Sequence, residues 1–221
     1  SDEVVLTDLA VDRNYEISVV AVNSQGQGPA GVPVVVWVGE AVPTAPPRDV
    51  TPQPISPTEV TLTWKPPLLA QQNGDLLGYK IFYLMTESPE EQEPGRRIEE
   101  EIEVVPASAT SHSLVFLDKF TQYRIQVLAF NPAGDGPRSK AVLVRTHQGL
   151  PSAPRNISFS EITMNSLIVA WEPPRRRNGL IHSYLVTYET IEQDERFSKQ
   201  VKQKVSERRL AVGGLEEEVE Y

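Results

Sequence analysis

The chain repeats itself at the length of a whole domain, and no other feature constrains its fold as strongly. YEISVVAVNSQGQGP and YRIQVLAFNPAGDGP are the best matched segments, and their first residues, Tyr15 and Tyr123, lie 108 positions apart. A period of just over a hundred residues is far longer than a solenoid unit, so the sequence predicts tandem copies of one domain. Three pairs of segments carry the match: 15–29 with 123–137, 59–67 with 166–174, and 73–83 with 178–188.

Within each copy the residues follow the pattern of β-strands. Val60, Leu62 and Trp64 alternate with two threonines, which is the period of two expected for a half-buried strand. Helical spacing is not sustained, and paired prolines between the strands would interrupt a helix. Asn-Gly pairs supply turn chemistry. We therefore expect an all-β fold of antiparallel sandwiches with about seven short strands each.

Composition and motifs exclude several classes of function. The chain has no cysteine, which excludes disulfide scaffolds, cysteine-ligated zinc and cysteine nucleophiles, and its net charge of −9 argues against a nucleic-acid partner. No signal peptide and no apolar stretch of about 18 residues is present, so membrane contact is expected only through a transmembrane segment outside this window.

The residue types that catalysis and metal binding need do not gather anywhere in the sequence. His112, His147 and His182 lie far apart, and no metal-binding or nucleophile motif occurs. Residues 26–31 read GxGxxG, but they lie between two expected strands with no helix following, so we interpret them as a turn that needs positive φ. We expect a non-enzymatic protein with no catalytic residues, cofactor or metal.

A leucine followed six residues later by a tyrosine occurs three times, and the last example is Leu215…Tyr221. In a Greek-key sandwich, such a tyrosine hydrogen-bonds back to the chain a few residues upstream, while the leucine fills the core. Aromatic residues of the matched segments are expected to pack beside them. The predicted core and tyrosine-corner residues are Leu9, Tyr15, Trp64, Tyr79, Leu117, Tyr123, Trp171 and Tyr184.

These landmarks resemble the fibronectin type III family: a tryptophan before two prolines, an Asn-Gly turn before a tyrosine, and the tyrosine corner. The resemblance covers the whole chain and implies one complete and two partial immunoglobulin-like sandwiches. In that family's strand order, residues 1–41 are expected to hold strands E to G of one repeat. Residues 42–148 would form a complete repeat, and residues 149–221 would hold strands A to E of another.

Within this family, four stretches are similar to repeats of the sidekick family of cell-adhesion proteins: 37–50, 72–83, 129–139 and 151–174. The resemblance implies extracellular spacer or interaction modules of a single-pass, synaptic cell-surface protein with protein partners. It also implies homophilic adhesion, carried by immunoglobulin domains outside this window. Two alternatives stay open, namely the ectodomain of a receptor tyrosine phosphatase and an intracellular muscle-type array.

Charged and polar surface residues supply the remaining candidates. Asn156 begins the only N-x-S/T sequon with a permitted middle residue, and it would carry a glycan if the chain is extracellular. Arg175, Arg176 and Arg177 are candidates for contact with an acidic partner, such as a neighbouring domain, an anionic glycan or a lipid surface. The glutamates at 99–101 are interpreted as exposed charges on a strand edge, and those at 216–218 lack the spacing of a calcium loop.

Overall fold

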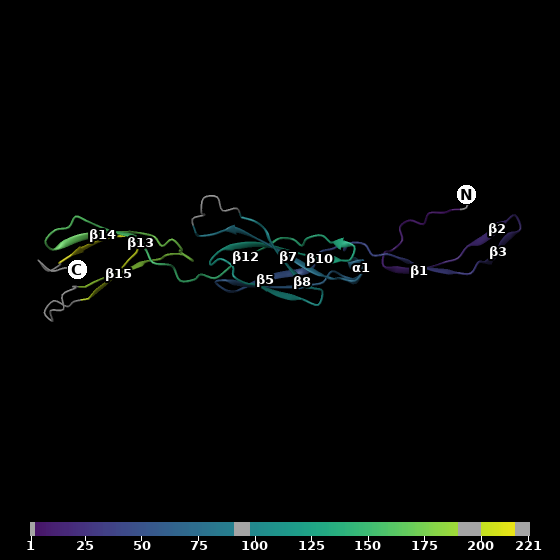
Figure 1. The fold of residues 1–221 in the computed structure, drawn as a ribbon, viewed down its shortest axis with the longest axis horizontal. Coiled ribbons are helices and arrows are strands. Elements are labelled where there is room, and N and C mark those ends of the chain that lie inside the picture. Colours follow the sequence, from purple (N-terminus) through teal and green to yellow (C-terminus); the bar gives the residue numbers. More distant parts are fainter. Residues whose placement is uncertain (1–2, 91–97, 190–199, 215–221) are drawn as a thin grey trace.

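The molecule is an elongated series of β-sheets. The structure, a computed structural model, describes residues 3–90, 98–189 and 200–214. In this part of the chain all regular structure is strand apart from one short helix, α1 (Leu69–Gln72). The strands nearest the two termini lie at opposite ends of the molecule (Figure 1). The all-β class predicted from the alternating pattern is confirmed.

The middle part of the chain is an antiparallel sandwich. One sheet contains β5 (Arg48–Ser56), β6 (Glu59–Lys65) and β9 (Ser111–Leu114), in that order. The second sheet has the order β11-β10-β7-β8, with β12 also paired to β10. Its strands are β7 (Gly78–Glu87), β8 (Glu101–Pro106), β10 (Gln122–Asn131), β11 (Gly134–Asp135) and β12 (Val142–Arg145). This arrangement agrees with the A-B-E and C′-C-F-G sheets that the resemblance implies.

The core of the sandwich lies between the two sheets because alternate residues of each strand face inward. Trp64 on β6 and Tyr79 on β7 meet edge to face with 5.4 Å between ring centroids, and both are almost fully buried. Tyr123 and Ile125 on β10 are buried with them. Leu117 is also buried and lies three residues beyond the end of β9.

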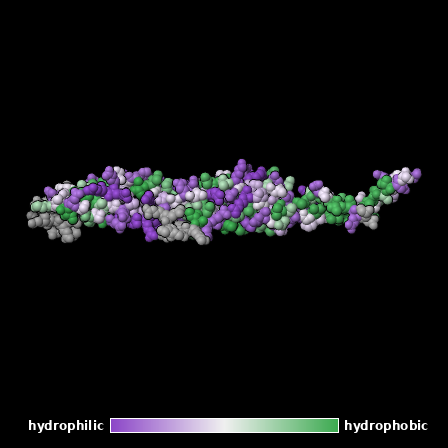
Figure 2. Space-filling model, turned by 90° about the horizontal axis from the view of Figure 1, so that it is seen from above, coloured by the Kyte–Doolittle hydropathy of each residue, from purple (hydrophilic) through white to green (hydrophobic). Residues whose placement is uncertain are grey.

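The N-terminal part contains two strand pairs. β1 (Arg13–Ile17) pairs with β4 (Val34–Val38), and β2 (Val20–Asn23) pairs with β3 (Gly26–Ala30). The alternating segment 15–23 is divided between the two pairings, because the chain leaves the first pairing after Ile17. Among residues 3–41 no further strand covers these pairs, so their apolar side chains are exposed, as the green surface of this narrow end shows (Figure 2).

The C-terminal part repeats the first strands of the middle sandwich. β13 (Arg155–Ser160), β14 (Ser166–Glu172) and β17 (Arg209–Gly213) form one sheet, and β15 (Tyr184–Tyr188) pairs with β16 (Val201–Val205). Trp171 and Tyr184 again meet edge to face at 5.4 Å. Between the two sheets lies an apolar cavity of about 720 Å³. In the middle sandwich the corresponding space is filled by side chains from β10 and β12.

The glutamate-rich segment at the start of β8 is exposed at Glu99 and Glu101, as expected, and β8 lies at the edge of its sheet, but two glutamates of this strand also contact the neighbouring strand. The strand begins at Glu101, and alternation then turns Glu101 and Glu103 toward Tyr83, whose hydroxyl donates to both carboxylates at 2.8 and 3.2 Å. Burial raises the pKa of Tyr83 above its ordinary value, and the hydrogen bond to Glu101 adds to that effect. Glu101 and Glu103 therefore serve as acceptors within the sandwich, and the run at 216–218 lies outside the described residues.

Candidate functional site: the junctions between repeats

Two linkers connect the three parts of the chain, namely residues 39–47 and residues 147–154. The first linker is hydrogen-bonded to the loop that precedes β7 in the middle repeat. The backbone N–H of Ala41 donates to the carbonyl of Asn73 at 3.0 Å, and the Asn73 amide Nδ2 donates back to the carbonyl of Val42 at 3.0 Å. The side chain of Glu40 accepts from the backbone N–H of Asp75 at 3.2 Å. Three consecutive linker residues are thus held by one loop.

The second linker makes the same contacts with the loop that precedes β15. The N–H of Gly149 donates to the carbonyl of Asn178 at 2.8 Å, and Asn178 Nδ2 donates to the carbonyl of Leu150 at 2.6 Å. Gln148 Oε1 accepts from the N–H of Leu180 at 2.8 Å. Each residue occupies the position of its counterpart in the first linker. We call each of these hydrogen-bonded sets a linker clasp.

At each junction, the residue bonded to the preceding unit is followed directly by a residue bonded to the next unit. The carbonyl of Gly39 accepts from the N–H of Asp12 in the preceding unit, and Glu40, the next residue, already contacts the following loop. At the second junction the carbonyl of His147 accepts from the N–H of Phe120, and Gln148 contacts the following loop. A connection without slack restricts the angle between units far more than a flexible linker would.

The local sequence explains why the loop can receive the linker. Asn73 has φ 54° and Asn178 has φ 52°, a left-handed conformation that asparagine tolerates better than most residues. Gly74 follows with φ 144°, and a Cβ built there would lie 2.7 Å from Cγ of Glu40. The Asn-Gly pair therefore supplies both the turn and the space that the linker side chain occupies.

Asn131 joins the first clasp to the hairpin between β10 and β11. Its Nδ2 donates to the carbonyls of Ala41 and Gln72 at 2.7 and 3.0 Å. Its Oδ1 accepts from the N–H groups of Ala133 and Gly134 at 3.0 and 3.3 Å. The side chain is 3% exposed and satisfies all of its hydrogen-bonding groups, so it fixes linker, loop and hairpin together.

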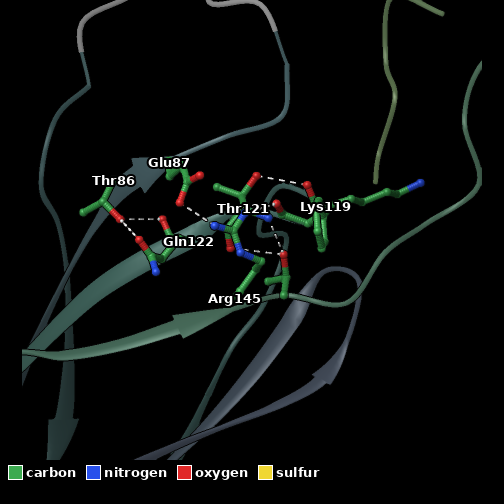
Figure 3. A network of polar contacts seen from close by, with 8 residues as sticks. Thr86, Glu87, Lys119, Thr121, Gln122 and Arg145 are labelled. Atoms are coloured by element: carbon green, nitrogen blue, oxygen red, sulfur yellow. Dashed lines mark hydrogen bonds and ion pairs between the residues drawn. The ribbon is translucent and has the colours of Figure 1, made fainter. Parts of the chain in front are cut away.

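The opposite end of the middle repeat is braced by a polar network that surrounds the tyrosine corner. The hydroxyl of Tyr123 accepts from the N–H of Asp118 at 2.9 Å. Arg145 donates to the carboxylate of Glu87 at 2.5 Å, a contact visible in Figure 3. It also donates to the carbonyl of Phe120 at 3.1 Å. Because Arg145 ends β12 two residues before His147, this network holds the strand from which the second linker leaves.

The remaining residues proposed from the sequence lie apart from one another. Trp171 and Tyr184 lie in the C-terminal core, whereas Leu9 and Tyr15 lie at the N-terminal corner, where the Tyr15 hydroxyl accepts from the N–H of Ala10 at 2.7 Å. Tyr221, the third corner tyrosine, lies outside the described residues. The described residues contain no group of three or more potential metal ligands, and no described helix is long and apolar enough to span a membrane.

Asn156 is exposed on β13, where a bulge interrupts the pairing with β14. It has φ 51°, and its Nδ2 donates to the carboxylate of Glu172 at 2.9 Å. The equivalent position in the middle repeat is Asp49, which has φ 54° and an ion pair with Lys65 at 2.8 Å. The sequon therefore lies at a surface position with the same left-handed backbone in both repeats. The carboxylate of Glu172 is the partner here, where the middle repeat has the ammonium group of Lys65.

The basic triplet lies in the loop of the second clasp. The carbonyl of Arg176 accepts from the N–H of Ser152 at 2.9 Å, as Gln71 does from Thr44 in the first linker. Sequence reasoning missed the two linker residues whose side chains enter the clasps. The signal was present, because the linker motifs PTAP (43–46) and PSAP (151–154) align at the same offset of 108 residues as the tyrosine corners.

Comparison with known proteins places the chain in a family. The family model for the fibronectin type III domain matches residues 45–145 and 152–221. The fold and the two junctions therefore define a class of structure, tandem β-sandwiches joined end to end. The chain belongs to the fibronectin type III family.

Curated relatives extend this result. Protein sidekick of Drosophila melanogaster is 66% identical over 220 residues, which is 100% of this chain and 10% of that protein. Protein sidekick-1 of Homo sapiens is 39% identical over 196 residues, which is 89% of this chain and 8% of that protein. Tyrosine-protein phosphatase Lar of Drosophila melanogaster is 34% identical over 186 residues, covering 83% of this chain and 9% of that protein. The resemblance to sidekick repeats is confirmed, and the chain spans a tenth or less of these relatives.

Proposed function

We propose that this chain is a rod-forming segment in the extracellular part of a cell-surface adhesion protein. The observation that carries the proposal is the absence of slack at both described junctions, where adjacent linker residues bind different units. Repeats joined in this way transmit orientation along the chain, which a spacer requires and an isolated binding domain does not. The identity to sidekick repeats supports the adhesion role.

The proposal also states where the segment is located and how the protein that contains it binds its partners. The segment would act without enzymatic activity, in a single-pass membrane protein whose membrane-spanning segment lies outside these residues. Homophilic adhesion would be carried by immunoglobulin domains that also lie outside them, so that the clasped repeats set the distance between those domains and the membrane. The sidekick relatives are about ten times longer than this chain, which leaves room for such segments outside the matched residues.

A cell-aggregation assay tests the spacer role. The segment is replaced in a full-length adhesion protein either by an unrelated rigid array of the same length or by a Gly/Ser linker of equal residue number. We expect the rigid replacement to preserve aggregation and the flexible one to weaken it, because a Gly/Ser chain has no fixed end-to-end distance. Loss of aggregation with the rigid replacement would show that the segment itself binds a partner, which contradicts a spacer.

Glycosylation of Asn156 tests the extracellular location. Asn156 is exposed at a surface bulge, and this supports N-glycosylation. A glycan on its side chain would replace the hydrogen bond to Glu172. Chain secreted from animal cells should lose mass on enzymatic removal of N-glycans, and the variants Asn156→Gln and Ser158→Ala should both abolish that loss. Ser158→Ala is the matched control because it keeps the asparagine. Unmodified secreted chain would remove this support and favour the intracellular muscle-type alternative.

The ectodomain of a receptor tyrosine phosphatase is the second candidate, favoured by the 34% identity to Lar. Both candidates use the segment as an extracellular rod, so they differ in what the rod is attached to. Mass spectrometry of the full-length protein isolated from its natural source distinguishes them. Peptides from a phosphatase domain in the same polypeptide would overturn the sidekick-like assignment.

A further inference from the structure

The second junction contains a contact that is independent of the linker. Glu90 lies three residues beyond the end of β7, in the middle repeat. Its Oε2 accepts from the backbone N–H of Arg177 at 2.9 Å, and its Oε1 accepts from the N–H of Asn178 at 2.7 Å. Both oxygens of one carboxylate are therefore bonded to consecutive amides of the next repeat.

The two amides are arranged to receive an anion. Asn178 has φ 52°, and successive N–H groups that converge before a left-handed residue form a concave site for negative charge. Hydrogen bonds from N–H groups to a carboxylate are stronger than those between neutral groups. The two groups that bond to the Glu90 carboxylate are backbone N–H groups, so these two hydrogen bonds do not use the arginine side chains of the basic triplet.

The segment that carries Glu90 and the second linker leave the middle repeat at different points. Gln122 on β10 pairs with Glu87 at the end of β7 on one side and with Arg145 at the end of β12 on the other. The segment that carries Glu90 and the linker thus leave the sheet two strands apart, about 9–10 Å. Between the repeats lies a cavity of about 560 Å³, lined by side chains of both.

We propose that Glu90 is a latch that fixes the angle between the middle repeat and the one that follows it. The second linker clasp restricts the angle between the repeats from one point, and a second attachment two strands away restricts rotation about that point further. The acidic partner expected for the loop of Arg175, Arg176 and Arg177 is, in this proposal, the neighbouring repeat of the same chain. The proposal rests on the rod-forming role, but its failure would leave the linker clasps intact.

Distance measurement between two spin labels tests the latch directly in the 221-residue chain. The chain has no cysteine, so Ser108→Cys in the middle repeat and Ser206→Cys in the following one can be labelled alone. Both positions are exposed. The distance distribution is measured with Glu90 intact and with Glu90→Gln or Glu90→Ala. Glu99→Gln, which changes an exposed glutamate of the same repeat, is the matched control.

We expect both Glu90 variants to broaden the distance distribution, while Glu99→Gln leaves it unchanged. In amide NMR spectra, Glu90→Gln should shift the Arg177 and Asn178 protons upfield, because a neutral amide is a weaker acceptor than a carboxylate. An unchanged distribution would overturn the latch, whether or not the two amide signals move. Equal broadening in Glu99→Gln would overturn it as well, because the effect would then follow from loss of charge anywhere on the repeat.

Discussion

Replacement of Asn131 by alanine should destabilise the middle repeat by about 2–4 kcal/mol. The substitution removes four hydrogen bonds, to Ala41, Gln72, Ala133 and Gly134. Each bond contributes roughly 0.5–1.5 kcal/mol net, and a partner left buried without a replacement costs more. The upper part of that sum is reduced because the hairpin amides lie near the surface and can bond to water.

Hydrogen exchange at fully buried amides of the middle repeat, such as those of Leu62 and Ile125, measures this loss, because their exchange requires opening of the sandwich. Asn131→Asp retains the two bonds that Oδ1 accepts but turns an oxygen toward two carbonyls, so it should destabilise at least as much. Gln53→Ala, an exposed change on β5, should stay within about 0.5 kcal/mol. If Asn131→Ala lowers the free energy of unfolding by less than about 1 kcal/mol, Asn131 does not hold the linker, the loop and the hairpin together as described.

Three further outcomes are expected. Trp64→Ala should cost about 3–5 kcal/mol in chemical denaturation of the middle repeat, and a loss below about 1 kcal/mol would contradict its central place in the core. Tyr123→Phe should cost about 1 kcal/mol by removing the bond from Asp118 while keeping the ring, whereas an unchanged midpoint would mean that the hydroxyl contributes nothing. The 221-residue polypeptide should associate head to tail, with residues 1–41 of one molecule docking on residues 150–221 of another, where the apolar cavity lies. Sedimentation at rising concentration checks this, and a strictly monomeric polypeptide with both ends protected from exchange would exclude it.

The sandwich could be predicted from the sequence because its signals are periodic. Alternation around Trp64 identifies a strand and its buried face, and repetition of the pattern about a hundred residues later identifies the domain length. The split after Ile17 could not be predicted in this way, since the apolar alternation continues through Val19 and Ala21. The point where a strand changes its partner depends on which other strands lie beside it, and the apolar periodicity of a segment contains no information about those strands.

The linker clasps could not be derived from residue pattern alone. They join backbone groups and short loop side chains, and their geometry depends on the left-handed conformation of Asn73 and Asn178. The sequence identified both Asn-Gly pairs as turns but gave no reason to connect them with linkers more than 25 residues away. Alignment of the two linkers places Glu40 opposite Gln148, and this correspondence would have indicated that both residues have the same role.

A pull on the two ends of this rod would reach the linker clasps before it reaches the cores. Tension enters the following repeat at Glu40 or Gln148, the first clasped residue, and loads the clasp bonds one after another rather than together. Peeling residues 40–44 from their loop would lengthen the molecule by less than their extended length of about 15 Å, at ~3.3 Å per residue, because the segment already spans part of that distance. The sandwich would still be folded. Each clasp would therefore act as a small, reversible extension element, visible in single-molecule stretching as a short step that precedes domain unfolding.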